Sequence, residues 1–233
     1  MLIQEVTKDE LDSKMVALIP IGSLEQHGPH LPLGTDSIIV EHIAKEIEKE
    51  LREKVVLFPT IWFTSSGEHE GFPYFGVRPL TLYNYLNDLL ESLVKQGFSK
   101  IVILNGHGGN TNILLLLQRE FNFNHKEKVY VLETWGKEEY DVFKRIDLHA
   151  GSIETSRIFY INEALVRREK IREIDDYTVK EGIFLTRKVI EANKWGVLDL
   201  GGGIEINKDL GEYSIKMRVS KIKDELQRII SSS

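Results

Sequence analysis

Cysteine is absent from the 233-residue sequence, and this absence excludes several kinds of chemistry at once. Without thiols the chain can have no disulfide framework, thiolate metal site, iron–sulfur cluster or cysteine nucleophile. The sequence also lacks an apolar run that approaches the ~20 residues of a membrane span, and its first residues contain no signal-peptide core. We therefore expect a cytoplasmic protein with no membrane partner.

Acidic residues outnumber basic ones, since the sequence has 30 Lys and Arg and 36 Asp and Glu, which gives a formal net charge of −6. No basic stripe interrupts this acidic balance, so nucleic acid is not expected to be a partner. Hydrophobic residues make up 42% of the chain and charged residues 28%. This composition is typical of soluble globular proteins rather than of disordered chains, and the chain is long enough to bury a substantial core.

Strand-like apolar runs alternate with helix-like patterns along most of the chain. We predict strands at 15–21, 55–64, 101–104 and 128–134, and helices at 37–51, 81–96, 110–121 and 152–166. Pro59 indicates that the second strand is an edge or irregular strand. Thr81 and Gly97 are expected near the start and just past the end of the second helix.

This alternation predicts an α/β fold in which right-handed crossovers join parallel strands and helices cover both faces of the sheet. No internal repeat, low-complexity tract or linker divides the sequence, so we expect a single domain over residues 1–233. The pattern is hardest to interpret from residue 167 onward.

The first group of chemically active side chains, residues 25–36 (EQHGPHLPLGTD), lies between the first predicted strand and the first predicted helix. Ligands of α/β sheets bind at such carboxyl ends of strands. Glu25 and His27 project to the same side of an extended chain, and the loop then brings Asp36 back to the same region. Carboxylate and imidazole ligands suit Zn²⁺, Mn²⁺ or Fe²⁺. In the alternative interpretation Asp36 is simply the helix N-cap, and the two roles are compatible.

The second group is residues 105–110 (NGHGGN), which again follow a predicted strand and precede a helix. Its glycines let the backbone approach a ligand closely. A phosphate-binding turn is one interpretation, but Thr111 stands where a dinucleotide fingerprint would have its third glycine. We therefore favour His107 as a metal ligand.

The third group is residues 147–156 (DLHAGSIETS), where we expect His149 in a loop and Glu154 in the first turns of a helix. A glutamate in that position often only complements the helix dipole. The sequence leaves this structural role and a functional role for Glu154 equally open.

In this order, residues 22–36 (GSLEQHGPHLPLGTD), 105–110 and 149–156 (HAGSIETS) resemble the creatininase (creatinine amidohydrolase) family. The resemblance implies a three-layer α/β/α sandwich with a mostly parallel central sheet. It also implies a divalent metal centre that hydrolyses C–N bonds of amides, and a homo-oligomer, possibly a hexamer. Members include an archaeal formamide hydrolase of flavin and deazaflavin biosynthesis and a peptidase that matures a redox peptide.

Carried over by position, Glu25, His27, Asp36 and His107 match the metal ligands of the family, with Asp36 placed to bridge two ions. His149 matches the histidine that creatininase uses as acid or base near the substrate. The resemblance thus implies a metal centre assembled from three separate parts of the chain.

Residues 65–73 (SSGEHEGFP) resemble the loop of the family on the substrate side, which makes Ser66 and His69 candidate substrate-binding residues. The usual Gly-Thr after the Phe-Pro of this loop is replaced by Tyr74 and Phe75. These departures put creatinine itself in doubt as the substrate.

Two further departures concern the metal and the substrate. Gly109 stands where creatininase has a glutamate ligand, so the second ion has lost a ligand unless Glu154 or water replaces it. Arg145 stands where creatininase has a lid tryptophan. Its planar guanidinium suits an anionic substrate, although a surface arginine is the more common explanation.

We expect a metal-dependent amidohydrolase that cleaves a C–N bond other than a peptide bond in a small-molecule amide, with one or two Zn, Mn or Fe ions per chain. Hydroxide held by the metal would attack the carbonyl, and His149 would act as acid or base, with Glu154 as a further ligand or catalytic group. Three alternatives stay open. They are a formamide hydrolase acting on a formylamino-pyrimidine nucleotide, a non-catalytic anion- or nucleotide-binding protein, and an assembly protein that has lost activity.

Overall fold

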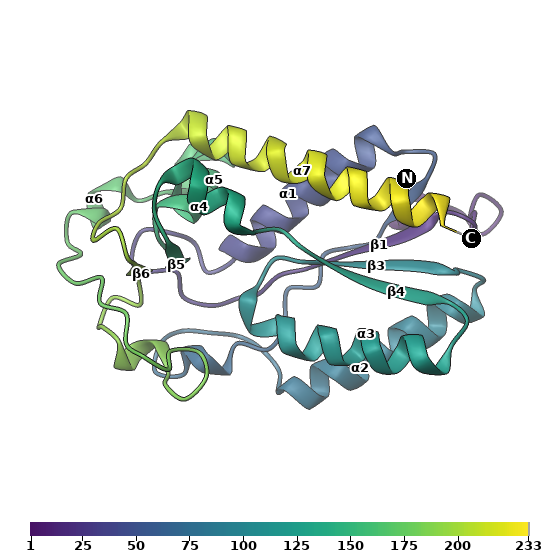
Figure 1. Cartoon of the computed structure of the whole chain (residues 1–233), viewed down its shortest axis with the longest axis horizontal. Helices are drawn as coiled ribbons and strands as arrows, with labels where there is room; N and C mark the ends of the chain where they lie inside the picture. Colours follow the sequence, from purple (N-terminus) through teal and green to yellow (C-terminus); the bar gives the residue numbers. More distant parts are fainter. Residues whose placement is uncertain (233) are drawn as a thin grey trace.

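Four buried apolar runs form a parallel sheet in the order β2–β1–β3–β4 in the computed structural model, which describes residues 1–232 (Figure 1). The strands are β1 (Val16–Ile21), β2 (Val55–Leu57), β3 (Lys100–Asn105) and β4 (Lys128–Glu133). Each residue of β1 is buried, because β1 has neighbours on both edges and helices over both faces.

Successive strand residues pack against opposite helical layers. Leu18 and Val102 belong to one buried apolar cluster, and Ile19 and Ile103 belong to the other. The helices of the first layer are α1 (Thr35–Glu50), α5 (Ser152–Ile161) and α7 (Lys208–Ser231), and those of the second are α2 (Pro79–Lys95) and α3 (Thr111–Asn124). Figure 1 shows these two layers above and below the sheet. The predicted α/β/α sandwich is confirmed.

The predicted second strand is shorter than expected. It ends at Leu57, before Pro59, and lies at the edge of the sheet as the proline indicated. The predicted start of the second helix was wrong, because Pro79 occupies its first turn and Arg78, not Thr81, is the N-cap. Gly97, with φ of 94°, lies just past the end of that helix as predicted.

The segment after β4 forms a second group of short elements on the left of Figure 1. They are α4 (Lys137–Phe143), β5 (Asp147–His149), α6 (Arg168–Ile171) and β6 (Leu198–Asp199). β5 pairs antiparallel with β6, so His149 ends a strand rather than lying in a loop as predicted. The helix predicted at 152–166 ends at Ile161, and a 3₁₀ turn (Glu163–Leu165) follows.

The remaining short elements are further 3₁₀ turns, at Ile3–Glu5, Gly67–His69, Gly108–Asn110 and Val189–Glu191. The N-terminus and the end of α7 lie at the right of Figure 1, away from the short elements. Within residues 1–232, none of the helices combines the length and the apolar character needed to cross a bilayer.

Candidate metal centre

The loops that follow β1 and β3 meet at the carboxyl edge of the sheet, where the N–H of Gly106 donates a 2.8 Å hydrogen bond to the carbonyl of Ile21. All four predicted metal ligands lie in or directly after these loops and are at most 5% exposed: Glu25, His27, Asp36 and His107. Parallel strands bring their carboxyl ends to one edge, which explains why residues far apart in the sequence converge here.

The Asp36 carboxylate lies between two imidazoles. Its Oδ1 is 3.1 Å from His27 Nε2, and its Oδ2 is 2.9 Å from His107 Nδ1. Ser23 Oγ donates a 2.8 Å hydrogen bond to Oδ2. The N-cap of α1 is Gly34, so Asp36 is not the helix cap. Each oxygen of the Asp36 carboxylate therefore contacts one of the two histidines.

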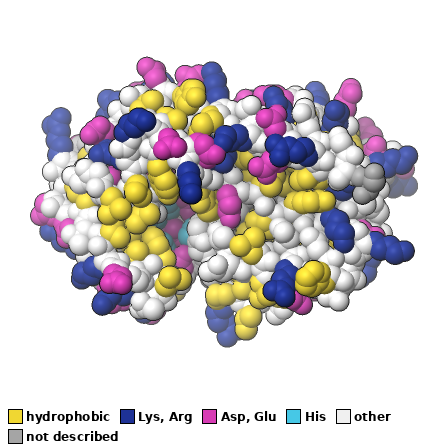
Figure 2. Space-filling view, in the orientation of Figure 1, with side chains coloured by type: hydrophobic (Ala, Val, Ile, Leu, Met, Phe, Trp, Pro, Cys, Tyr) yellow, Lys and Arg dark blue, Asp and Glu magenta, His cyan; other side chains and the backbone are white. Residues whose placement is uncertain are grey.

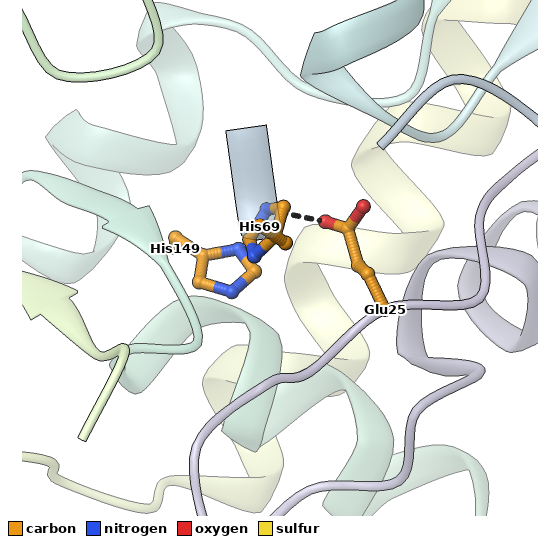
Figure 3. A group of neighbouring side chains, drawn as sticks. All are labelled: Glu25, His69 and His149. Atoms are coloured by element: carbon orange, nitrogen blue, oxygen red, sulfur yellow. Dashed lines mark ion pairs between the residues drawn. The ribbon is translucent and has the colours of Figure 1, made fainter. Parts of the chain in front are cut away.

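Glu25 carries two buried carboxylate oxygens that accept no hydrogen bond from the described residues. His69 Nε2 lies 3.0 Å from Oε1, and His107 Nε2 lies 3.2 Å from Oε2. Figure 3 shows His69 pointing toward Glu25, with His149 beside it. A buried carboxylate is strongly unfavourable unless a positive charge compensates it. Carboxylate oxygens and imidazole nitrogens are also ligands of zinc, manganese and iron, so these residues fit a divalent cation.

The electrostatics of the centre favour positive charge between the carboxylates. Burial lowers the pKa of His27, but the Asp36 and Glu154 carboxylates outweigh burial and raise that pKa to about 10. Burial raises the pKa of Asp36, but His27 and His107 outweigh it and hold that pKa well below its usual range. The same negative potential would attract a metal cation.

His149 and Glu154 lie on the His27 side of the centre. The rings of His27 and His149 have centroids 4.3 Å apart, and Glu154 Oε2 lies 3.8 Å from His27 Nε2. Glu154 Oε2 also accepts a 2.6 Å hydrogen bond from the N–H of Ala150. One ligand atom from each of His27, His149 and Glu154 falls within 4.8 Å of the others, so Glu154 is positioned to take part in the centre.

Gln26, which the sequence reasoning did not single out, holds two of the histidines. Its Nε2 lies 3.1 Å from His69 Nδ1 and 3.0 Å from His149 Nε2, and its carbonyl oxygen lies 2.8 Å from His149 Nε2. The same Nε2 donates to the carbonyl of Gly196 at 3.1 Å. Its place between Glu25 and His27 in the extended segment was the available signal.

A cavity of about 320 Å³ opens over the centre. Figure 2 shows this part of the surface hollowed, with histidine and acidic side chains at the bottom and hydrophobic side chains along one edge. The apolar lining residues are Ile39, Trp135, Tyr140, Leu148, Ile153, Phe184 and Leu185. The size is in the range of small-molecule sites.

A family model described as creatininase, creatinine amidohydrolase, matches residues 1–226. The chain belongs to the creatininase family. The mycofactocin precursor peptide peptidase of Mycolicibacterium smegmatis is 34% identical over 153 residues, which cover 63% of this chain and 58% of that protein. The aligned part of the chain thus spans less than two thirds of that relative.

A relative that aligns with most of the chain is the 2-amino-5-formylamino-6-ribosylaminopyrimidin-4(3H)-one 5'-monophosphate deformylase of Methanothermus fervidus. It is 26% identical over 233 residues, 92% of this chain and 85% of that protein. Among solved structures, a manganese form of creatininase matches with a TM-score of 0.82 at 20% identity and covers 99% of both chains. This likeness shows the creatininase fold.

Three residues of this creatininase-family chain were expected to bind substrate, and only one of them lines the cavity. His69 lines the cavity and contacts Glu25, so it belongs to the group of possible metal ligands. Ser66 is fully buried outside the cavity lining, and its Oγ has no hydrogen-bond partner within residues 1–232.

Arg145 is the third of these residues, and it does not line the cavity. Its guanidinium donates to Ser152 Oγ and to the carbonyl of Gly201, and its Nε lies 3.7 Å from Asp199 Oδ1. These contacts join the start of α5 to the end of β6. The geometry therefore gives Arg145 a structural environment and does not support the expected contact with an anionic substrate.

Proposed function

We propose that this protein is a metal-dependent hydrolase that cleaves a C–N amide bond of a small molecule, with one or two divalent cations held by Glu25, His27, Asp36 and His107. The observation that carries the proposal is the Glu25 carboxylate. Both of its oxygens are buried and accept no hydrogen bond from the described residues, yet they lie within 3.0–3.2 Å of imidazole nitrogens below an open cavity.

A bound divalent cation supplies two kinds of chemistry, since it lowers the pKa of water to ~7 and polarises a carbonyl oxygen. Asp36 orients the two halves of the centre through its contacts with His27 and His107. His149 lies against the His27 ring and is held by Gln26, where it can pass a proton to the amide nitrogen before the C–N bond breaks.

The pKa of His149 indicates its protonation state before the reaction. Burial, followed by the charges of His27 and His69, holds the pKa of His149 well below its ordinary value. The imidazole is therefore neutral at pH 7, so His149 would have to gain a proton during the reaction before it could donate one to the leaving nitrogen.

The cavity favours an uncharged amide over a phosphate-bearing one. Arg157 is the single Lys or Arg among the described residues that line it. Its Nη2 lies 2.8 Å from Glu139 Oε1, its Nη1 donates to the carbonyl of Thr134, and its Nε donates to Ser214 Oγ. Since these contacts occupy the guanidinium, a phosphate would find no free cationic side chain in the lining.

The proposal is tested by removing and restoring the metal. Protein stripped with EDTA is expected to lose hydrolysis of an amide panel that contains creatinine, formamides with and without a phosphate, and short peptides. Zn²⁺, Mn²⁺ or Fe²⁺ should restore the hydrolysis, with unphosphorylated substrates preferred. Asp36→Asn should prevent restoration, whereas Asp9→Asn, at a side chain that is 85% exposed, should not. Full activity of a rigorously metal-free sample would contradict the proposal.

A further inference from the structure

One carboxylate at the centre comes from a part of the chain that the ligand prediction did not include. Glu68 lies in the 3₁₀ turn Gly67–His69, between β2 and α2. Its Oε1 lies 3.2 Å from His107 Nε2, its side chain is 15% exposed, and it lines the cavity. Glu25, Glu68 and His107 each present a ligand atom within 4.8 Å of the other two.

Gly109 provides the space that Glu68 occupies. A Cβ built on Gly109 would lie 2.1 Å from Glu68 Oε1 and 2.4 Å from His107 Nε2, both closer than non-bonded atoms can approach. The backbone of Gly109 is outside the left-handed region, so its conformation does not require glycine. A side chain at position 109 would therefore require the Glu68 carboxylate to move from its present position.

The two sides of the centre have different neighbouring carboxylates. Glu154 lies beside His27 and already accepts the N–H of Ala150. On the His107 side, Glu68 stands next to Glu25, whose buried oxygens lack hydrogen bonds from the described residues. Two carboxylates this close to one imidazole repel each other unless a positive charge, on the imidazole or on a bound cation, lies among them.

We propose that Glu68 is a metal ligand on the His107 side of the centre and supplies the carboxylate that a glycine at position 109 cannot. The chain between β2 and α2 would then be tied to the metal as well as to the sheet. This segment already folds back onto the first loop, since the N–H of Gln26 donates to the carbonyl of Pro73 and that of Phe75 to the carbonyl of Leu24.

The inference rests on the proposed function, and metal affinity tests it without any substrate. Binding of Mn²⁺ and Zn²⁺ to the metal-stripped full chain would be measured by isothermal titration calorimetry for the wild type, Glu68→Gln and Glu70→Gln. Glu70 is a matched control two residues away, because its side chain is 63% exposed and pairs with Lys188 outside the centre. Glu68→Gln keeps the size of the side chain and removes its charge.

We expect Glu68→Gln to weaken binding of at least one ion by more than ~10-fold, the lower limit for the loss of an outer partner of a metal site. Glu70→Gln should stay within about twofold of the wild type on the same scale. The visible spectrum of the Co²⁺-loaded protein should change in Glu68→Gln and also in Glu68→Asp, whose shorter carboxylate remains charged. Glu68→Asp serves as the readout if Glu68→Gln does not fold.

Equal affinities and unchanged Co²⁺ spectra in the Glu68 variants would overturn the inference. If the wild type itself bound no ion, the proposed function would fail instead, so the two failures can be told apart.

Discussion

The two walls of the cavity differ in how they are built. One wall, the sheet wall, carries Glu25, Asp36 and His107, with His27 behind them, and follows directly from the ends of β1 and β3 in the four-stranded sheet. The other wall, which we call the cover, carries His149 and Glu154 and depends on the pairing of β5 with β6 and on contacts of His149 with Gln26. In the proposed function, the regular sheet would hold most of the metal ligands, and the less regular cover would hold the proton-transfer group.

This comparison separates metal binding from proton transfer, two properties that are often lost together. If His149 transfers protons and does not hold the metal, its loss should reduce the rate and leave the metal in place. Loss of a ligand on the sheet wall should remove both the metal and the activity. Variants on each wall therefore test the division directly.

Among variants of the cover, His149→Ala is expected to reduce activity most. Loss of a positioned acid or base typically costs ~10²–10⁴-fold in rate, so kcat should fall by about that factor. Metal content, measured by elemental analysis, should stay equal to that of the wild type, because Glu25, Asp36 and His107 do not depend on His149. Near-normal turnover would remove the assigned role, and loss of metal would erase the distinction between the two walls.

A half-buried carboxyl group at the end of β4, Glu133, is not a proposed ligand and allows a pH-dependent prediction. Glu133, at the end of β4, accepts hydrogen bonds from Asn105 Nδ2 and Thr111 Oγ1 at 2.9 and 3.1 Å. Burial is the main cause that raises the pKa of Glu133 to about 7. Its contribution to stability is therefore complete below the unfolded pKa near 4.5 and is lost as the pH rises through about 7.

Glu133→Gln should remove this titration. Compared with the wild type, its free energy of unfolding should rise between pH 5 and 8.5 by up to about 3 kcal/mol, measured by urea denaturation in EDTA. Glu120→Gln, at an exposed position on α3, should keep the pH dependence of the wild type. A constant difference between Glu133→Gln and the wild type across this range would show that Glu133 does not titrate there.

The smallest effect on activity is expected from Arg145→Ala. The variant should lose about 1–2 kcal/mol of stability, because it removes hydrogen bonds to Ser152 and Gly201. The ratio of kcat/KM for a phosphorylated formamide to that for an unphosphorylated one should change by less than about twofold. A selective loss of activity on the phosphorylated substrate would place Arg145 at the substrate and contradict its structural role.

The residues of the sheet wall could be predicted from the sequence because the patterns that indicate them lie within short segments. An apolar run such as 15–21, followed at once by polar residues and a helix, defines a strand end, and parallel topology brings such ends together. Glu25, His27, Asp36 and His107 were found in this way. The same reasoning gave the layers of the fold but misplaced the start of α2, because Thr81 is a less decisive signal than a proline in the first turn.

The cover could not be predicted in the same way because its contacts are long-range. The partner of β5 is a strand of two residues, too short to show a pattern. Glu68 reaches the centre only because the segment between β2 and α2 folds back onto residues 24–26, which local sequence does not reveal. α7 is different, since its buried Ile215, Val219 and Ile222 follow a helical spacing that was available in the sequence.

The most direct test of the central claim is a crystal structure of the Mn²⁺- or Zn²⁺-loaded protein, with anomalous scattering measured at the absorption edge of the metal. The account predicts one or two peaks among Glu25, His27, Asp36 and His107, at about 2.0–2.3 Å from their oxygen and nitrogen atoms. Anomalous peaks elsewhere on the molecule, or none at the edge of the sheet at saturating metal, would contradict it.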